Sequence, residues 1–260
     1  MTGTEIRLTN YPFALLSELR DAANEHGYRI GPEQAAGWLF FRSASAPGEI
    51  AVAATVAGLD GPLFLSITHP GAARELNAEP AAPCANGHSA AFVFPGRDAL
   101  FAAVSDVYRL SMSLPTHPFE EYLAECAYLG DTEYDRIQKF RIGQDKFRNA
   151  LLTYWNSQCP LTGITEPDLL RASHIIPWAR CESDAERLNL YNGLLLSSLW
   201  DAAFDAGLLS FDDHGRAIAS PMLSAAALAE LKIDAVPPLP LSAEHRIRLK
   251  WHREEIWLGG

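Results

Sequence analysis

The chain has 260 residues, of which 48% are hydrophobic and 20% charged, so it can build a folded core and does not read as disordered. Its 32 acidic and 21 basic side chains give a formal net charge of -11, which over the whole chain disfavours contact with nucleic-acid phosphates. No apolar run approaches the ~20 residues of a membrane span, and the first residues lack the layout of a signal peptide. Four cysteines without a CxxC pair indicate neither a disulfide framework nor a zinc ribbon. We therefore expect a soluble, reduced, cytoplasmic protein with no membrane partner.

The negative charge is concentrated in the first half of the chain. Residues 1–135 hold 17 acids and 7 bases, a net charge of -10. Residues 136–260 hold 15 acids and 14 bases, a net charge of -1. This asymmetry predicts two domains with different tasks. We place an acidic recognition or regulatory domain at 1–115, a helical connector at 116–135 and a second domain at 136–260.

The first half predicts an α+β fold. Helical periodicity over residues 11–26 ends at His26-Gly27, and short apolar runs bounded by Gly, Pro, Asp and Asn then predict strands at 37–41, 50–56, 62–68 and 89–94. Leu59-Asp60-Gly61 predicts a hairpin turn between the second and third runs. A short helix is expected over 73–79, and an amphipathic helix over 98–113.

The second half predicts a strand, a loop, a strand and a helix, framed by two basic helices. A helix over residues 135–155 is followed by a turn and an apolar segment at 169–178. Within the segment 190–197, a second strand is expected after the Asn192-Gly193 turn, and a helix is expected at 199–208 that ends at Gly207. The last helix lies near the C-terminus.

The basic side chains of this half form groups that could face phosphates. We take as candidates for DNA binding Arg136, Lys139, Arg141, Lys146 and Arg148 on the first helix, with Arg171 and Arg180 around the first strand. His245 and His252 flank the C-terminal helix and are further candidates for phosphate binding. The alternative is a solvated helix face, and composition alone does not decide between the two.

Polar residues with chemical potential fall within the strand–strand–helix segment. Ser173-His174 ends the first strand, and Asn192 precedes the second. Asp201 and Asp205 are four residues apart on the expected helix, so their carboxylates share one face and repel each other. A hard divalent cation, Mg²⁺ or Mn²⁺, would relieve that repulsion. The alternative is a pair of ordinary surface acids, or Asp201 acting as a helix cap.

Three stretches together carry a resemblance to a known family. They are Ala172-Ser173-His174-Ile175-Ile176-Pro177-Trp178, Asn192-Gly193-Leu194-Leu195-Leu196 and Asp201-Ala202-Ala203-Phe204-Asp205-Ala206-Gly207. This pattern resembles the HNH endonucleases, and more narrowly the bacterial restriction-type subgroup reading ASHIxPW…NGLLL…FDxG. The resemblance covers about residues 135–215 and implies a ββα-metal nuclease fold with flanking helices. It implies His174 as general base, Asn192 as the residue that holds the loop, and Asp201 and Asp205 as metal ligands.

The sequence departs from the common family pattern at several positions. Asp201 stands where many members have histidine, and Ser173, before the base, is a weak metal ligand. Cys159 is followed by Thr162 at the partner position of a CxxC pair, so we do not expect a structural zinc. Water and substrate phosphate would then complete the coordination of Mg²⁺ or Mn²⁺.

Together with these residues, the resemblance implies a metal-dependent DNA endonuclease of a restriction or phage-defence system. Histidine has an unperturbed pKa near 6.5, which suits His174 to deprotonate an attacking water near neutral pH. One alternative is a catalytically decayed HNH protein that binds DNA or regulates. Another is a nuclease held inactive by its acidic N-terminal domain. DNA is the expected partner, and a homodimer is left open.

Overall fold

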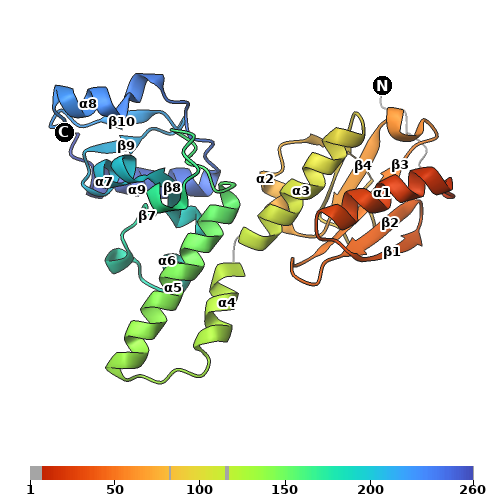
Figure 1. The fold of residues 1–260 in the computed structure, drawn as a ribbon, viewed down its shortest axis with the longest axis horizontal. Helices are drawn as coiled ribbons and strands as arrows, with labels where there is room; N and C mark the ends of the chain where they lie inside the picture. The colour runs from red at the N-terminus through yellow and green to blue at the C-terminus, as the bar shows by residue number, and fades with distance from the viewer. Residues whose placement is uncertain (1–7, 82, 115–116, 260) are drawn as a thin grey trace. The chain divides into compact units, whose positions relative to one another are not determined.

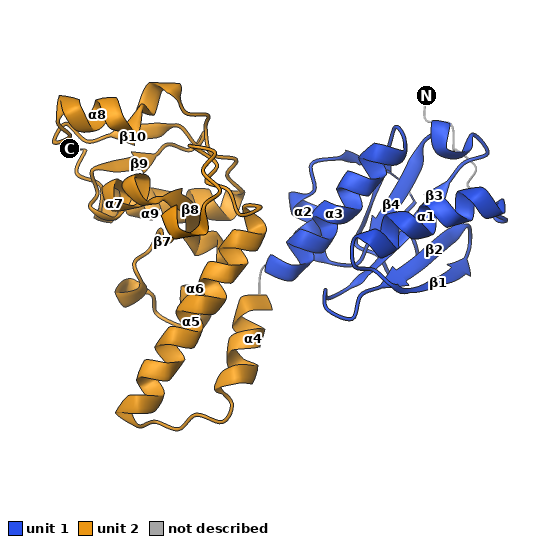
Figure 2. Ribbon diagram, in the orientation of Figure 1, with its two compact units in different colours: residues 1–114 blue, residues 115–260 orange. Residues whose placement is uncertain are grey.

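The computed structural model describes residues 8–81, 83–114 and 117–259. The chain forms two compact units, residues 1–114 and residues 115–260 (Figure 2). Both units mix helices and strands. Within the described ranges, every helix is too short or too polar to span a lipid bilayer.

Unit 1 is built around a six-stranded antiparallel sheet in the order β1-β2-β3-β4-β6-β5 (Figure 1). Its helices α1 and α3 lie next to each other, and α3 contacts β4 and β6. The elements are α1 (Phe13–Glu25), β1 (Ile30–Ala35), β2 (Trp38–Arg42), β3 (Glu49–Ala54), a 3-10 turn (Gly58–Asp60), β4 (Leu63–Ile67), α2 (Pro70–Glu75), β5 (Glu79–Pro80), β6 (Ala90–Phe94) and α3 (Arg97–Ser113).

Apolar side chains are buried on both faces of the sheet in unit 1. Every residue of β4 is buried, which fits a central strand. One apolar cluster contains no helix residue; its members are Trp38, Ala51, Ala53, Phe64, Ala85 and Ala91. A loop residue, Ala85, therefore helps cover the face that carries Phe64.

The strands predicted at 37–41, 50–56, 62–68 and 89–94 are confirmed as β2, β3, β4 and β6. The turn predicted at Leu59-Asp60-Gly61 is confirmed as the connection between the antiparallel strands β3 and β4. The edge strand β1 was not predicted, because its sequence Ile-Gly-Pro-Glu-Gln-Ala has no apolar alternation and it is mostly exposed.

Unit 2 opens with two packed helices, α4 (His117–Cys126) and α5 (Glu133–Tyr154). Thr132 and Asp135 form a capping box that fixes the start of α5. Lys146 of α5 pairs with Glu125 of α4 at 2.9 Å. The segment 116–135, assigned to a connector from sequence, therefore belongs to the second compact unit.

The predicted strand–strand–helix order is confirmed as β7 (Leu170–His174), β8 (Gly193–Ser197) and α7 (Ser198–Asp205). The two strands are antiparallel and pair from Leu170 with Ser197 to His174 with Gly193. Helix α5 packs on both strands, and α7 also contacts both. A Cβ at Gly193 would lie 2.5 Å from the Phe147 ring, so glycine is what lets α5 approach β8 this closely.

The remaining elements of unit 2 surround the strand pair. They are the 3-10 turns Pro167–Leu169, Trp178–Arg180, Leu190–Asn192 and Ile233–Ala235, the helices α6 (Asp184–Arg187), α8 (Ala225–Leu231) and α9 (Ala243–Glu255), and the hairpin β9 (Leu209–Phe211) and β10 (Ala217–Ala219). The C-terminal segment is tied back to the end of α7, because the Leu258 amide donates to the Gly207 carbonyl at 2.9 Å. Helix α9 therefore belongs to the wall around the strand pair.

Candidate active site

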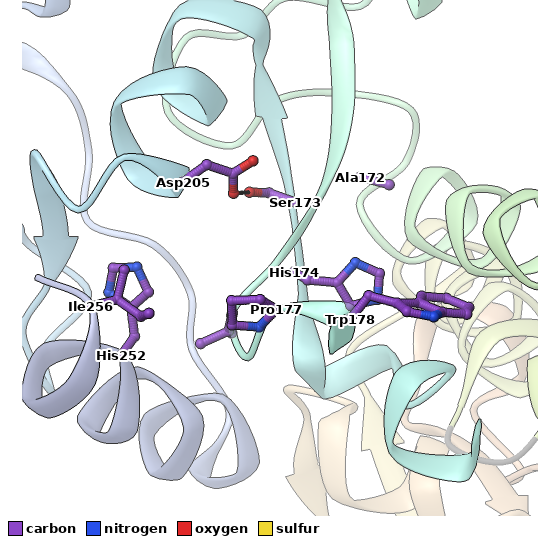
Figure 3. A pocket seen from close by; sticks show the side chains of 9 residues that line it. Ala172, Ser173, His174, Pro177, Trp178, Asp205, His252 and Ile256 are labelled. Carbon is purple, nitrogen blue, oxygen red and sulfur yellow. Dashed lines mark hydrogen bonds between the residues drawn. The ribbon is translucent and has the colours of Figure 1, made fainter. Parts of the chain in front are cut away.

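A cavity of about 340 Å³ lies at the end of β7. Side chains from β7, the loop after it, α7 and α9 line the cavity (Figure 3). Figure 3 shows Asp205 and Ser173 at one edge, with His174 on one side and His252 on the other. The lining residues are Ala172, Ser173, His174, Ile175, Pro177, Trp178, Asp205, His252 and Ile256.

His174 is held in one orientation by contacts on several sides. Its ring lies on the Phe147 ring with centroids 3.9 Å apart and planes inclined by 17°. The Trp178 ring meets it edge to face at 5.6 Å. The Nε2 atom lies 2.9 Å from the Arg187 carbonyl oxygen, which can accept but not donate. Nε2 therefore carries the proton, and in the neutral ring Nδ1 keeps its lone pair.

The surroundings of His174 also keep the ring neutral. Burial lowers the pKa of His174 below its usual value, and the hydrogen bond to the Arg187 carbonyl offsets part of that effect. A neutral imidazole with a free lone pair is the form that accepts a proton. In this form the ring can accept a proton near neutral pH.

Asn192 fixes the loop that follows His174. Its Oδ1 accepts from the Ile176 amide at 2.8 Å, and its Nδ2 donates to the Ile176 carbonyl at 3.1 Å. The Asn192 carbonyl also accepts from the Ile175 amide at 2.9 Å. Since Asn192 is fully buried, these bonds are made without competition from water. Asn192 therefore ties the loop after His174 to the start of β8.

The two carboxylates of α7 lie one helical turn apart. Burial raises the pKa of Asp201, while the Ser173 hydroxyl and the charge of Arg171 act in the opposite direction. Partial burial of its carboxyl group, followed by the charge of Asp201, raises the pKa of Asp205, although the residue as a whole is exposed. The Ser173 hydroxyl donates to Asp205 Oδ1 at 3.4 Å. Both carboxylates are therefore costly to keep ionised without a cation.

The donor set fits a hard divalent ion that keeps several waters. Across residues 8–81, 83–114 and 117–259, no group of three or more His, Cys, Asp or Glu side chains is placed to hold a metal. Asp201, Asp205 and the Ser173 hydroxyl would supply oxygen ligands, and the mutual repulsion of the carboxylates favours a cation between them. Oxygen ligands and incomplete protein coordination are typical of Mg²⁺ sites.

The basic residues proposed for DNA binding fall into two groups. Three of them are engaged within unit 2: Lys139 donates to the Gly130 carbonyl, Lys146 pairs with Glu125, and Arg148 donates to the Pro167 and Leu170 carbonyls. The Arg171 guanidinium donates to nearby backbone carbonyls but remains exposed. Exposed side chains remain at Arg136, Arg141 and Arg180.

The expectation that His245 and His252 bind phosphate is wrong, because both are buried, with 0% and 2% of their surface exposed. Burial lowers the pKa of His245 to about 3 and that of His252 to about 4, so both are neutral at pH 7. The spacing of His245, Leu249 and His252 along α9, at positions i, i+4 and i+7, is the sequence signal of an inward face.

His252 supports the carboxylate helix, a role that the sequence did not predict. Its ring lies parallel to the Phe204 ring of α7, with centroids 4.0 Å apart and planes inclined by 6°. Its Nδ1 shares a hydrogen bond with the Ser210 hydroxyl at 3.0 Å. Phe204 stands between Asp201 and Asp205 in the chain, so this stacking fixes the helix that carries both acids.

Comparison with known families agrees with this geometry. A family model described as HNH endonuclease matches residues 159–212. The match places an HNH domain in the C-terminal part of the chain, and the matched stretch contains β7, β8 and α7. Phe147 of α5 and His252 of α9 lie outside it. No curated protein matches the chain.

Proposed function

We propose that the protein is a metal-dependent endonuclease that hydrolyses DNA phosphodiester bonds in unit 2. The observation that carries this proposal is the shared cavity: His174, fixed through Nε2 and kept neutral by burial, lines the same space as Asp205. A base and a carboxylate pair suited to Mg²⁺ or Mn²⁺ are the two requirements of this hydrolysis. The HNH family match supports the same reaction class.

In the proposed reaction, His174 Nδ1 accepts a proton from water while the water oxygen forms a bond to phosphorus. The bond between phosphorus and the 3′ oxygen breaks, and the 3′ oxygen takes a proton from a second water, which gives 5′-phosphate and 3′-hydroxyl ends. A divalent cation held by Asp201 and Asp205 would neutralise the charge that develops on the phosphate and the leaving oxygen. Ser173 would orient Asp205, to which its hydroxyl already donates. Asn192 would keep the base in place through its bonds to Ile176.

The wider biological role is proposed from the sequence pattern. The restriction-type motif supports a part in restriction or phage defence. Residues 1–115 would then serve recognition or regulation. Their 11 acids and 7 bases give a net charge of -4, so this part of the chain has no excess of bases with which to hold the DNA backbone. Cleavage of DNA from hosts with different base modifications would test this role, and equal cleavage of all such DNAs would argue against it.

The nuclease assignment is tested by incubating the full chain with plasmid DNA in Mg²⁺, Mn²⁺ or EDTA. We expect nicking with either metal and none in EDTA, with a loss of at least 100-fold in His174→Ala and Asp201→Ala. His214→Ala is the matched control, because His214 is exposed in the turn after β9. Binding without cleavage in every metal would instead support a catalytically decayed DNA-binding protein.

A further inference from the structure

Helix α5 carries two exposed arginines, Arg136 and Arg141, whose charge is not neutralised by an ion pair with a described residue. The side facing α4 is neutralised, because Lys146 pairs with Glu125 and Lys139 lies 3.5 Å from Asp131. By contrast, the structure shows no ion pair or side-chain hydrogen bond from Arg136 or Arg141 to any residue that it describes. Asp145 lies four residues after Arg141 and so shares a side of α5 with it, but the structure shows no ion pair between these two described side chains. These two arginines are therefore available to bind phosphates.

An aromatic side chain is exposed on the side of α5 that carries Arg136, and Arg141 follows it about 100° around the helix. Phe140 lies four residues after Arg136, so the two share a side of α5, and it is 43% exposed. Its ring meets the Trp178 ring edge to face, with centroids 5.2 Å apart. The Trp178 ring also packs against Gly143, where an added Cβ would approach it to 2.9 Å. One side of Phe140 is therefore packed on Trp178, while part of its ring stays open to solvent.

The exposed ring lies next to the proposed active site. Trp178 contacts both Phe140, at 5.2 Å, and His174, at 5.6 Å, so the Phe140 and His174 ring centres lie no more than about 11 Å apart. Stacked nucleotides are spaced by about 3.4 Å, so this distance spans about three of them. A strand whose phosphate occupies the cavity would place a neighbouring base within reach of Phe140.

We propose that Phe140 is a stacking platform for an unpaired nucleobase of the substrate strand, with Arg136 and Arg141 binding its phosphates. This proposal rests on the proposed function and narrows its substrate class. In a duplex, both faces of each base are covered by neighbouring bases, whereas an unpaired base can stack on an aromatic ring. Unit 2 would therefore favour single-stranded or locally opened DNA over intact duplex.

The test measures DNA binding without cleavage, using the full chain with His174→Ala in EDTA. The probes are a fluorescein-labelled single strand of about 12 nucleotides and the same strand annealed to its complement, followed by fluorescence anisotropy. Phe140→Ala and Phe140→Leu should each weaken single-strand binding by about 5- to 100-fold. Phe140→Tyr should restore it, because tyrosine keeps the aromatic face. Ile137→Ala, which removes a 47% exposed side chain on the same helix, is the matched control and should bind normally.

The outcomes separate this proposal from the nuclease assignment. Selective loss of single-strand binding in the Ala and Leu variants, with duplex binding changed less than about twofold, supports stacking. If Phe140→Leu binds the single strand like the parent, or if single-strand and duplex binding fall equally, the proposal is wrong. If the binding pattern holds while the wild-type chain cleaves neither DNA with Mg²⁺ or Mn²⁺, the stacking site stands and the nuclease assignment fails.

Discussion

The His174 imidazole lies face to face with the Phe147 ring, at 3.9 Å between centroids and 17° between planes. Phe147 comes from α5, outside the segment that matches the HNH endonuclease family. The proposed base is thus desolvated and oriented by a helix that precedes the motif. The pH dependence of the proposed reaction should therefore depend on Phe147, although its side chain neither ionises nor reacts.

Phe147→Leu should shift the pH profile of cleavage. Burial lowers the pKa of His174, so the wild-type base stays neutral somewhat below pH 6.5. A smaller side chain hydrates the imidazole and moves its pKa back toward the usual value, so the acid limb of kcat/KM moves to higher pH. We expect a loss of about 10-fold at pH 6 and a smaller loss at pH 8. Phe41→Leu, at a fully buried phenylalanine of unit 1, is the control. An unchanged acid limb in Phe147→Leu would show that Phe147 does not set the pKa.

Asp205→Asn should stabilise the metal-free protein while removing its response to metal. The pKa of Asp205 is raised in the folded state, so its protonated form contributes to stability at acid pH, and this contribution is lost as pH rises through that pKa. At pH 7 in EDTA, the neutral amide of the Asp205→Asn variant avoids the cost of a partly buried, ionised carboxylate beside Asp201. The variant should therefore unfold at a higher temperature than wild type. The difference should vanish near pH 3, where the carboxyl group is protonated.

Addition of Mg²⁺ provides the second half of the Asp205 test. Mg²⁺ should raise the unfolding temperature of the wild-type chain but not of Asp205→Asn. Asp212→Asn, a carboxylate in the turn after β9, is the control and should keep the metal response. Equal stabilisation of all three proteins by Mg²⁺ would place the metal elsewhere.

Asn192→Ala should reduce turnover without reducing metal affinity. The substitution leaves the buried Ile176 amide and carbonyl without their side-chain partner, which costs about 1–3 kcal/mol of stability. The loop after the base loosens, so we expect kcat to fall by about 100-fold. Mg²⁺ affinity, measured by calorimetry, should change little because Asp201 and Asp205 lie on α7. A parallel loss of metal binding would mean that Asn192 supports the whole site and does not act on the base loop alone.

His252→Phe should make unit 2 less sensitive to acid. The folded pKa of His252 is about 4, whereas an unfolded histidine has a pKa near 6.5, so stability is lost as pH falls between these values. For one such histidine, the free energy of unfolding falls by about 3 kcal/mol as pH drops through this range. Phenylalanine keeps an aromatic ring on Phe204 but cannot be protonated. Its unfolding free energy should therefore fall less steeply from pH 7 to pH 4.

Urea unfolding followed by tryptophan fluorescence measures this effect, because five of the six tryptophans lie in unit 2. His214→Phe, at an exposed histidine, is the control and should retain the wild-type pH dependence. An identical slope in His252→Phe and wild type would show that His252 is not the residue disfavoured by acid.

Local signals in the sequence were sufficient to predict the strand–strand–helix order of β7, β8 and α7. His174, Asn192 and Asp205 belong to three short stretches within residues 172–207, and apolar runs set the strands around them. The partners that tune the site come from distant segments and carry no motif. Phe147 is one apolar position among many on α5, and His252 resembles a surface histidine until its helical spacing with Leu249 is considered.

Charge was the least predictable feature. The basic residues of α5 looked uniform in sequence. In the structure, Lys146 pairs with an acid of α4, whereas Arg148 donates hydrogen bonds to backbone carbonyls. Composition could not separate these side chains from Arg136 and Arg141, because their partners depend on how α4 folds back along α5. The exposure of Phe140 depends on the same packing.

Chemical rescue of His174→Gly is the most direct test of the central claim that His174 is the general base. The variant leaves a space beside Phe147 into which exogenous imidazole fits, since the ring it replaces stacks there. Single-turnover cleavage of labelled DNA should fall by at least 100-fold in His174→Gly and recover in part as imidazole is added with Mg²⁺ present. Asp205→Ala should show no such recovery. Wild-type cleavage by His174→Gly without imidazole, or equal recovery in both variants, would contradict the account.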